Sequence, residues 1–274
     1  MALTTFYITN NLDIALIAEK CGVNRIWIDL ETLGKEERQK GMNTVKSHHT
    51  IDDIKCIAPK LTTAQMMVRV NPWNEGSTQE IDKVVEAGAE TIMLPMWKTP
   101  QEVQNFISAV NGRTRTSILL ETKEAVECLD EVLKIKGIDE IHIGLNDLHL
   151  SYHLTFMFEL LTNGAVESII NKIKTTDIPY GFGGVSHIGD GLLPAEMIIL
   201  EHYRMGSKNV ILSRSFCDTN LPLEELYVDF NNKMTAMREF EKSITKEMIE
   251  QNREVIKERV DKVVAIIKER KKCN

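Results

Sequence analysis

The sequence predicts an α/β protein, a (β/α)8 TIM barrel that carries an extended helical arm at its C-terminus. Three observations favour this fold. Short β-rich runs alternate with longer stretches of helical period, which is typical of βα units around a parallel sheet. Eight such runs occur, the number that closes this type of barrel. The chain has 274 residues, and about 250 residues is a usual length for one such barrel.

Each predicted strand is a short run of β-branched, aromatic or large apolar side chains bounded by polar or turn-forming residues. An open, doubly wound parallel sheet would give nearly the same pattern, and on pattern alone we favour the closed barrel by about two to one. The predicted strands are residues 6–9 (FYIT), 25–30 (RIWIDL), 66–70 (MMVRV), 91–94 (TIML), 116–120 (TSILL), 140–143 (EIHI), 179–182 (PYGF) and 209–212 (NVIL).

Helices are predicted between these strands from their start and stop signals. The segment TIDD at residues 50–53 resembles a capping box with Asp in the acidic position. Residues 31–50 form an unusually long polar segment, and loops of that length in compact domains are more often functional than idle. The predicted helices cover residues 13–21, a segment that starts at TIDD, 81–87, 100–107, 123–133 and a segment that starts near Pro194.

The strand signal disappears after residue 220, so we assign residues 1–220 to a barrel domain and residues 221–274 to a helical extension. In the segment Met248–Ile267, apolar residues recur at steps of three and four, with charged residues on the other faces. This pattern predicts a long amphipathic helix with Thr245 at its cap position. Its apolar stripe has to be covered, either by its own barrel or by a neighbouring subunit that exchanges the arm, and both remain open.

The composition argues against several classes of protein. With 43% hydrophobic and 27% charged residues the chain is an ordinary globular protein, and no apolar run approaches the roughly 18 residues that a membrane span needs. The first residues lack the basic and apolar stretches of a secretion signal, so a cytoplasmic location is expected. A formal charge of −7 argues against a nucleic-acid partner, and five scattered cysteines indicate reduced, structural thiols rather than a zinc site.

Charged side chains follow several predicted strands, which is where a barrel places its active site. Two carboxylates from different strands, Glu121 and Asp147, leave coordination positions open for water and substrate, the usual arrangement for Mg²⁺ or Mn²⁺. Arg69 could hold a substrate carboxylate or stabilise an enolate oxygen. The charged residues at the strand ends are Asp29 and Glu31 after the second strand, Arg69 at the third, Glu121 after the fifth and Asp147 after the sixth.

Each of these residues also has a purely structural explanation. A carboxylate after a strand is often a helix N-cap, and Arg69 could belong to a structural ion pair. Their joint appearance at several rim positions is what favours a site. Among the histidines, His142 lies within a strand and is expected in the core, whereas His48 and His49 in the long polar segment could supply a base.

Two segments near the end of the barrel could bind an anion. GFGGVSHIGDG at residues 181–191 follows the seventh predicted strand, and SRSF at residues 213–216 follows the eighth. Glycine-rich backbone and an arginine at this part of a barrel rim often bind phosphate. In this interpretation Ser186 and Arg214 bind an anionic substrate, whereas a tight turn and a salt bridge would explain the same residues without a ligand.

Five segments resemble the HpcH/HpaI aldolase and citrate lyase family, whose members are metal-dependent barrels that make or break carbon–carbon bonds next to an enolate. The segments occur in the family order, with matching strand contexts, over roughly residues 5–216. They are IDLE (28–31), VRVNPWN (68–74), EAGAETIMLPM (86–96), LLETKEA (119–125) and IDEIHIGLNDL (138–148).

The resemblance implies a barrel in which Glu121 and Asp147 bind the divalent metal and Arg69 contacts the keto acid or its enolate. It implies that the backbone at Asn146 and Asp147 holds a substrate carboxylate. It also implies a homo-oligomer, a trimer or a hexamer, because family members are commonly hexamers that exchange their last helix between subunits.

The sequence departs from the family where protons are transferred. After the carboxylate that matches Glu31, the pyruvate aldolase branch has a histidine and the citrate lyase branch an aspartate, whereas this chain has Thr32. Leu119 replaces a glutamine of the aldolase branch, and Glu86 matches the acidic partner of the missing histidine. A threonine hydroxyl is not a base near pH 7, so Glu31, His49 or a metal-bound water would have to take that role.

The predicted function is a divalent-metal-dependent carbon–carbon lyase or aldolase. It would act on a 2-oxo acid such as pyruvate or oxaloacetate, with an anionic or hydroxylated aldehyde as the partner, and with Arg69, Glu31 and His49 as the catalytic candidates. Two alternatives stay open: a citrate-lyase-like lyase of CoA thioesters, and a barrel that has lost catalysis and serves as an oligomeric binding protein.

Overall fold

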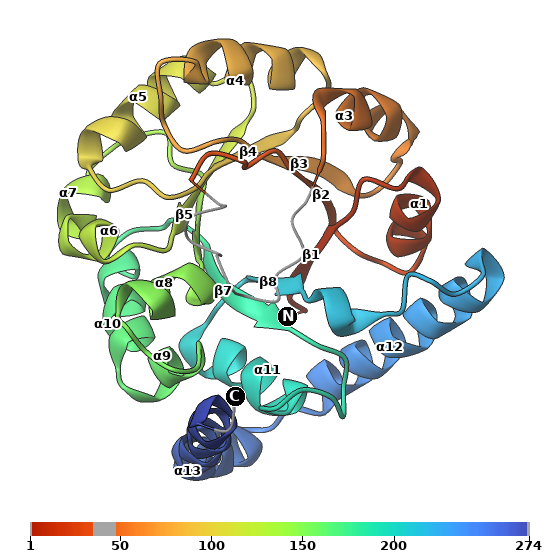
Figure 1. The fold of residues 1–274 in the computed structure, drawn as a ribbon, viewed down its shortest axis with the longest axis vertical. Coiled ribbons are helices and arrows are strands. Elements are labelled where there is room, and N and C mark those ends of the chain that lie inside the picture. The colour runs from red at the N-terminus through yellow and green to blue at the C-terminus, as the bar shows by residue number, and fades with distance from the viewer. Residues whose placement is uncertain (1, 35–47, 273–274) are drawn as a thin grey trace.

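A computed structural model describes residues 2–34 and 48–272 of the chain. Its eight strands are parallel and close into a barrel in sequence order, with helices around the outside (Figure 1). Closure is direct, because β1 (Thr4–Ile8) pairs with β2 (Arg25–Asp29) on one side and with β8 (Asn209–Leu212) on the other. The predicted TIM barrel is therefore confirmed, and the open doubly wound sheet, which would leave two edges unpaired, is excluded.

The strands lie close to their predicted positions, and three of them, β4, β6 and β8, have the predicted bounds. β7 (Tyr180–Val185) is longer than predicted, because the glycine-rich segment continues the strand with a register irregularity between Gly181 and Gly184. The other strands are β3 (Gln65–Arg69), β4 (Thr91–Leu94), β5 (Arg115–Leu120) and β6 (Glu140–Ile143).

The helices begin largely where the capping signals place them. Thr50 closes the predicted capping box by accepting a hydrogen bond from the Asp53 N–H, while the Asp53 carboxylate accepts from the Thr50 N–H. The helices and 3₁₀ turns through β5 and just beyond it are α1 (Leu12–Lys20), α3 (Ile51–Ile57), η1 (Ala58–Lys60), α4 (Ser77–Glu86), α5 (Pro100–Val110), α6 (Lys123–Glu127) and α7 (Leu129–Val132). The predicted helix 123–133 is thus two helices, which meet at Cys128.

Between β6 and β7 the structure has three helices that we did not predict. Two of them are only seven and four residues long, too short for a helical period to stand out. The third, α10 (Ala165–Ile173), buries an apolar face, and its apolar residues recur at steps of three and four, so its helical period was detectable in the sequence. The remaining helical elements are α8 (Leu145–Ser151), α9 (Glu159–Thr162), α10 (Ala165–Ile173), α11 (Ala195–Met205), η2 (Arg214–Phe216), α12 (Leu223–Ser243) and α13 (Lys246–Lys272).

The inside of the barrel is packed rather than hollow, and its packing decides where the polar residues lie. Because side chains alternate along a strand, every second residue points inward. An apolar layer fills the middle of the barrel. Two residues further toward the carboxyl ends, Asp29, Arg69 and Glu121 occupy the next inward positions and so line the mouth. The apolar layer consists of Phe6, Trp27, Met67, Met93 and Leu119.

The helical arm packs on the barrel of its own chain. α12 contacts α1, while α13 contacts α11 and α9 and lies outside them in Figure 1. Thr245 caps α13 as predicted, by accepting a hydrogen bond from the Met248 N–H at 3.2 Å, and Asn252 donates to Glu201 Oε1 of α11 at 3.0 Å. Exchange of the arm between subunits stays a prediction. None of the described helices is long and apolar enough to cross a membrane.

Candidate active site

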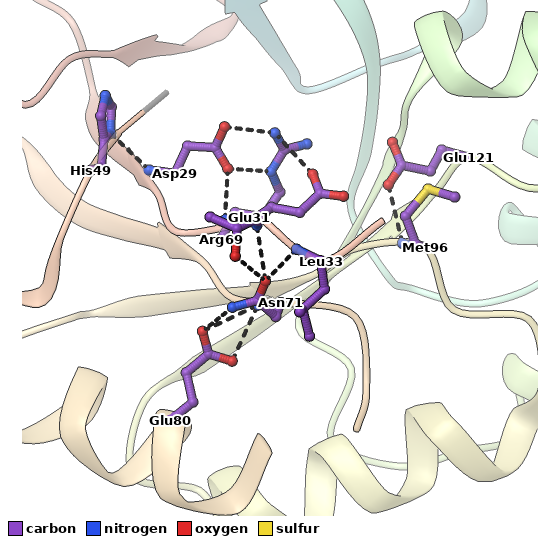
Figure 2. A network of polar contacts seen from close by, with 10 residues as sticks. Asp29, Glu31, Leu33, His49, Arg69, Asn71, Glu80, Met96 and Glu121 are labelled. Carbon is purple, nitrogen blue, oxygen red and sulfur yellow. Dashed lines mark hydrogen bonds and ion pairs between the residues drawn. The ribbon is translucent and has the colours of Figure 1, made fainter. Parts of the chain in front are cut away.

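Arg69 is at the centre of an ion-pair network in the mouth of the barrel (Figure 2). Its Nε and Nη2 donate to Asp29 Oδ1 and Oδ2, both at 2.9 Å, and Nη2 lies 3.2 Å from Glu31 Oε2. Asp29 and Glu31 are buried, and the Arg69 side chain is 12% exposed. Burial alone would lower the pKa of the guanidinium, but the adjacent carboxylates outweigh it and raise that pKa. Arg69 is therefore held charged beside two carboxylates.

Glu121 lies directly after β5 and is buried at the same mouth. Burial, and next the negative charge of Asp147, raise the pKa of its carboxyl well above the ordinary range. Glu31 adds to the rise, whereas Arg69 and a hydrogen bond from the Met96 N–H, 3.1 Å from Oε1, lower it. Met96 has a φ of 53°, which is uncommon for a residue other than glycine. Glu121 is thus a buried acidic group whose ionised form needs a nearby cation.

Asp147 lies in the first turn of α8, which starts immediately after β6. It is half-buried, and its neighbour Asn146 is exposed. The first N–H groups of any helix have no partner within the helix, so those of α8 can bind a carboxylate. Gly144 leaves room for this arrangement, because a Cβ atom on it would lie only 2.8 Å from Glu121 Oε2. The two predicted metal ligands therefore come from neighbouring strand ends and interact electrostatically.

The histidines have different roles in the structure. His49 lies just before α3, and its Nδ1 accepts a hydrogen bond at 3.0 Å from the N–H of Asp29, the last residue of β2 (Figure 2). A neutral imidazole that accepts at Nδ1 carries its hydrogen on Nε2. His142 is fully buried as predicted, with Nδ1 2.8 Å from Asn209 Oδ1 and Nε2 3.2 Å from the Gly183 carbonyl oxygen.

The rim after β7 and β8 carries a chain of hydroxyl groups. Ser186 Oγ donates to Asp190 Oδ2 at 2.5 Å, Ser215 Oγ lies 3.1 Å from Ser186 Oγ, and Ser213 Oγ lies 2.9 Å from Ser215 Oγ. The bond from Ser186 is the main reason why the pKa of Asp190 is lowered, so this carboxylate is ionised and can only accept. The single hydroxyl hydrogen of Ser186 is donated to Asp190. Ser215 therefore has to donate to Ser186, and Ser213 has to donate to Ser215.

Arg214 lies between these serines and is exposed. Its pKa is lowered, first by desolvation of the guanidinium, while Asp29 raises it and Arg69 lowers it. These interactions place Arg214 within electrostatic range of the mouth. No salt bridge joins it to another residue in the described part of the chain, so the salt-bridge explanation for this arginine has no support there.

Asn71 and Glu80 complete the network of Figure 2, and sequence reasoning missed both. Asn71 Nδ2 donates to Glu80 Oε1 at 2.7 Å, and Asn71 Oδ1 accepts from the N–H groups of Thr32 and Leu33. The predicted residues Glu31, Arg69, Glu121 and Asp147 are brought together, while Ser186 and Arg214 lie at the other part of the rim. Among residues 2–34 and 48–272, no three His, Cys, Asp or Glu side chains form a metal-binding group by themselves.

The profile of the HpcH/HpaI aldolase/citrate lyase family matches residues 3–180. The chain belongs to this family. The match covers β1 to β6 and all five charged residues of the mouth, Asp29, Glu31, Arg69, Glu121 and Asp147, whereas most of β7, β8 and the helical arm lie beyond it.

Two relatives with known names support the assignment to the HpcH/HpaI family. Hydroxypyruvate/pyruvate aldolase of Sagittula stellata is 25% identical over an alignment of 169 residues, and the match covers 51% of this chain and 61% of that protein. 2-Keto-3-deoxy-L-rhamnonate aldolase of Escherichia coli is 27% identical over an alignment of 107 residues, and the match covers 28% of this chain and 40% of that protein. The aligned regions thus span less than two thirds of either relative.

Solved structures of HpcH/HpaI proteins have the same fold. An HpcH/HpaI aldolase from Desulfitobacterium hafniense superimposes with a TM-score of 0.60 at 15% identity, covering 77% of this chain and 86% of the other. An HpcH/HpaI aldolase/citrate lyase family protein from Burkholderia cenocepacia gives 0.57 at 13% identity, covering 87% and 95%. At these identities the likeness supports the barrel and says nothing about substrates.

Proposed function

We propose that this protein is a divalent-metal-dependent lyase or aldolase that makes or breaks a carbon–carbon bond next to the keto group of a 2-oxo acid. The observation that carries the proposal is the buried Glu121 carboxyl, which interacts with Asp147 beside an arginine held charged by Asp29 and Glu31. A buried carboxyl with a raised pKa in a barrel mouth is typical of a functional site. The names of the two relatives support pyruvate or a similar 2-oxo acid as the substrate.

The residues fit a divalent cation such as Mg²⁺ or Mn²⁺. Glu121 and Asp147 would hold it, because oxygen ligands suit these hard cations and because a cation would offset the cost of ionising a buried Glu121 beside Asp147. Two carboxylates leave the other positions to water and to the substrate. The cation would polarise the keto oxygen of the substrate and offset the negative charge that builds up on it.

The chain's own groups would bind the 2-oxo acid and move its proton. The N–H groups at Asn146 and Asp147 would bind the substrate carboxylate, and Arg69 would donate to the keto oxygen. Glu31 Oε2, which lies 3.2 Å from Arg69 Nη2, is our candidate base. In cleavage it would accept the proton of the hydroxyl group beside the carbon–carbon bond that breaks and return a proton to the enolate carbon, and in exchange it would accept a methyl proton of the 2-oxo acid. His49 is less suited to this step in its neutral form, because its Nδ1 already accepts from the Asp29 N–H.

The partner aldehyde would extend toward the rim of β7 and β8, where Ser186 and Arg214 would bind it. Each serine hydroxyl from Ser213 to Ser186 donates its hydrogen to the next group, and the last donates to Asp190. Toward a ligand these serine oxygens can therefore act only as hydrogen-bond acceptors. Acceptors beside the donors of Arg214 suit hydroxyl groups, which both donate and accept, better than a phosphate that only accepts. Of the anionic and hydroxylated partners, we therefore favour the hydroxylated one.

We also propose a cytoplasmic homo-oligomer, a trimer or a hexamer. The arm supports this, because Val228 and Val255 of α12 and α13 are at least half exposed. Exchange of the arm would cover such residues in a neighbouring subunit.

Exchange of the methyl protons of pyruvate with solvent deuterium tests the proposed function, because it needs only the 2-oxo acid and the site. We expect exchange with Mg²⁺ or Mn²⁺, none with a chelator present, and a loss of about 100-fold or more in Asp147→Asn. Glu124→Gln is the matched control, because Glu124 is an exposed carboxylate just outside the site. If the wild-type protein catalyses no proton exchange on any 2-oxo acid in the presence of either metal, the proposal is overturned and the non-catalytic alternative is favoured.

A further inference from the structure

The Asn71 side chain joins the ends of two neighbouring strands. Its Oδ1 accepts from the Thr32 N–H at 2.9 Å, from the Leu33 N–H at 3.0 Å and from Thr32 Oγ1 at 3.3 Å (Figure 2). Thr32 directly follows Glu31, and Asn71 lies two residues after Arg69. The Asn71 amide oxygen therefore joins the segment that follows Glu31 to the end of β3, where Arg69 lies.

Glu80 fixes which way the Asn71 amide faces. It lies in the first turn of α4 and accepts from Asn71 Nδ2 at 2.7 Å and from the Asn71 backbone N–H at 3.2 and 3.3 Å. A carboxylate accepts but does not donate, so it selects the amide orientation that points Oδ1 at Thr32. Burial raises the pKa of Glu80, and these hydrogen bonds from Asn71 counteract the rise.

The arrangement matters because the Glu31–Arg69 contact depends on both strand ends. Glu31 and Arg69 come from different strands, and their closest atoms are 3.2 Å apart. Thr32 and Leu33 are exposed, so hydrogen bonds to Asn71 rather than burial of their side chains anchor the backbone that follows Glu31. A shift of about 1 Å in a reacting group can cost on the order of 100-fold in rate.

We propose that Asn71 and Glu80 are positioning residues, which set the Glu31 carboxylate against Arg69 by fixing the backbone of Thr32 and Leu33. The inference rests on the proposed function for its kinetic consequence. Neither residue contacts the 2-oxo acid in this scheme, since both act through the segment that follows Glu31.

A pair of substitutions that reverses the polarity of the contact tests this proposal. Asn71→Asp keeps an acceptor for Thr32 and Leu33 but sets a second carboxylate against Glu80. Glu80→Gln added to it supplies a donor again, so the double variant can restore the contact with donor and acceptor exchanged. Asn74→Asp is the matched control, because the side-chain bonds of Asn74 stay within the loop before α4.

We expect Asn71→Asp to lower kcat for metal-dependent pyruvate proton exchange by about 10- to 100-fold, with KM for pyruvate changed less than about threefold, since a charge-assisted hydrogen bond is replaced by repulsion. The double variant should recover to within about fivefold of the wild type, and Asn74→Asp should stay within about twofold. Hydrogen exchange at the Thr32 and Leu33 amides gives a second readout, which should be fast in Asn71→Asp and slow again in the double variant.

The outcomes separate the two proposals. If the wild-type protein catalyses no proton exchange on pyruvate, the proposed function is overturned, regardless of the hydrogen-exchange rates of the Thr32 and Leu33 amides. An active wild type whose Asn71→Asp variant keeps its kcat, or whose double variant recovers amide protection but not kcat, overturns the positioning role. Should Asn71→Asp fail to fold, Asn71→Ser removes the same hydrogen bonds without adding charge, and a full kcat in that variant would contradict the proposal equally.

Discussion

The two halves of the barrel mouth are built differently. At the ends of β2, β3 and β5, charged side chains are buried and paired, and Arg69 bonds to Asp29 through two nitrogens at 2.9 Å. At the ends of β7 and β8, Arg214 is exposed and the serines bond to one another. The first half lies inside the family match and the second beyond it. We infer that the buried half carries out the proposed chemistry and that the exposed half binds the partner aldehyde.

Removing Arg69 should have the largest effect, because it leaves Asp29 and Glu31 buried without their cation. We expect Arg69→Met to cost about 3–5 kcal/mol of unfolding free energy, as for the loss of one partner of a buried ion pair, and to abolish proton exchange. Urea denaturation measures the first and deuterium incorporation the second. Lys172→Met is the control, since the Lys172 ammonium pairs with Asp130 at the surface and its loss should cost about 1 kcal/mol or less. Equal costs in the two variants would show that burial adds nothing to the stabilising effect of the Arg69 ion pairs.

A methyl group on Gly144 should damage the buried half alone. Gly144 has a φ of −81°, so alanine causes no backbone strain, but its Cβ would lie 2.8 Å from Glu121 Oε2. We expect Gly144→Ala to lower exchange activity by about tenfold to 100-fold through displacement of Glu121. Gly184→Ala on β7 is the control, because its Cβ would lie at an ordinary 3.5 Å from the Ile211 carbonyl oxygen. An unaffected Gly144→Ala variant would show that Glu121 is not held in place as tightly as this packing indicates.

The pH dependence of stability should report the raised pKa of Glu121. A carboxyl whose pKa is raised on folding favours the folded state below its ordinary pKa, and this contribution is lost as pH rises through the raised value. Without metal, the wild type should therefore lose stability over this range relative to Glu121→Gln, and added Mn²⁺ should raise Tm more at high pH than at low pH. Calorimetry across pH measures both, and identical profiles for wild type and variant would contradict the assignment.

Changes in the exposed half should have the smallest effect and act on the partner aldehyde. We expect Arg214→Gln and Ser215→Ala to raise KM for a hydroxylated aldehyde by about three- to tenfold, as for the loss of one hydrogen bond to a ligand. KM for an aldehyde without hydroxyl groups should change less. Steady-state kinetics with glyceraldehyde and acetaldehyde as partners of pyruvate compare the two. An equal rise for both aldehydes would argue against hydroxyl recognition at this rim.

The strand ends were predictable because a barrel translates sequence position into spatial position. Asp29, Arg69 and Glu121 follow or end apolar runs, so counting strands was enough to place them at one mouth. The contact between Asn71 and Thr32 was not predictable, because the two residues are 39 positions apart and neither follows a recognised motif. The Asn71–Glu80 pair, only nine residues apart, depends on how α4 packs beside β3, which no local pattern encodes.

The sequence by itself determined the alternation of strands and helices, the helical arm with its cap at Thr245, and the set of charged residues at the strand ends, because periodicity and capping are local properties of the chain. Closure of the barrel was decided by the tertiary structure, through the pairing of β1 with β8. Only the tertiary structure decided how those charges are paired. The direction of the Ser186 hydroxyl, the nitrogen by which His49 is held and the orientation of the Asn71 amide each depend on a partner brought close by folding. Hydrogen bonds need donor and acceptor within about 3 Å, and a sequence does not specify distances on that scale.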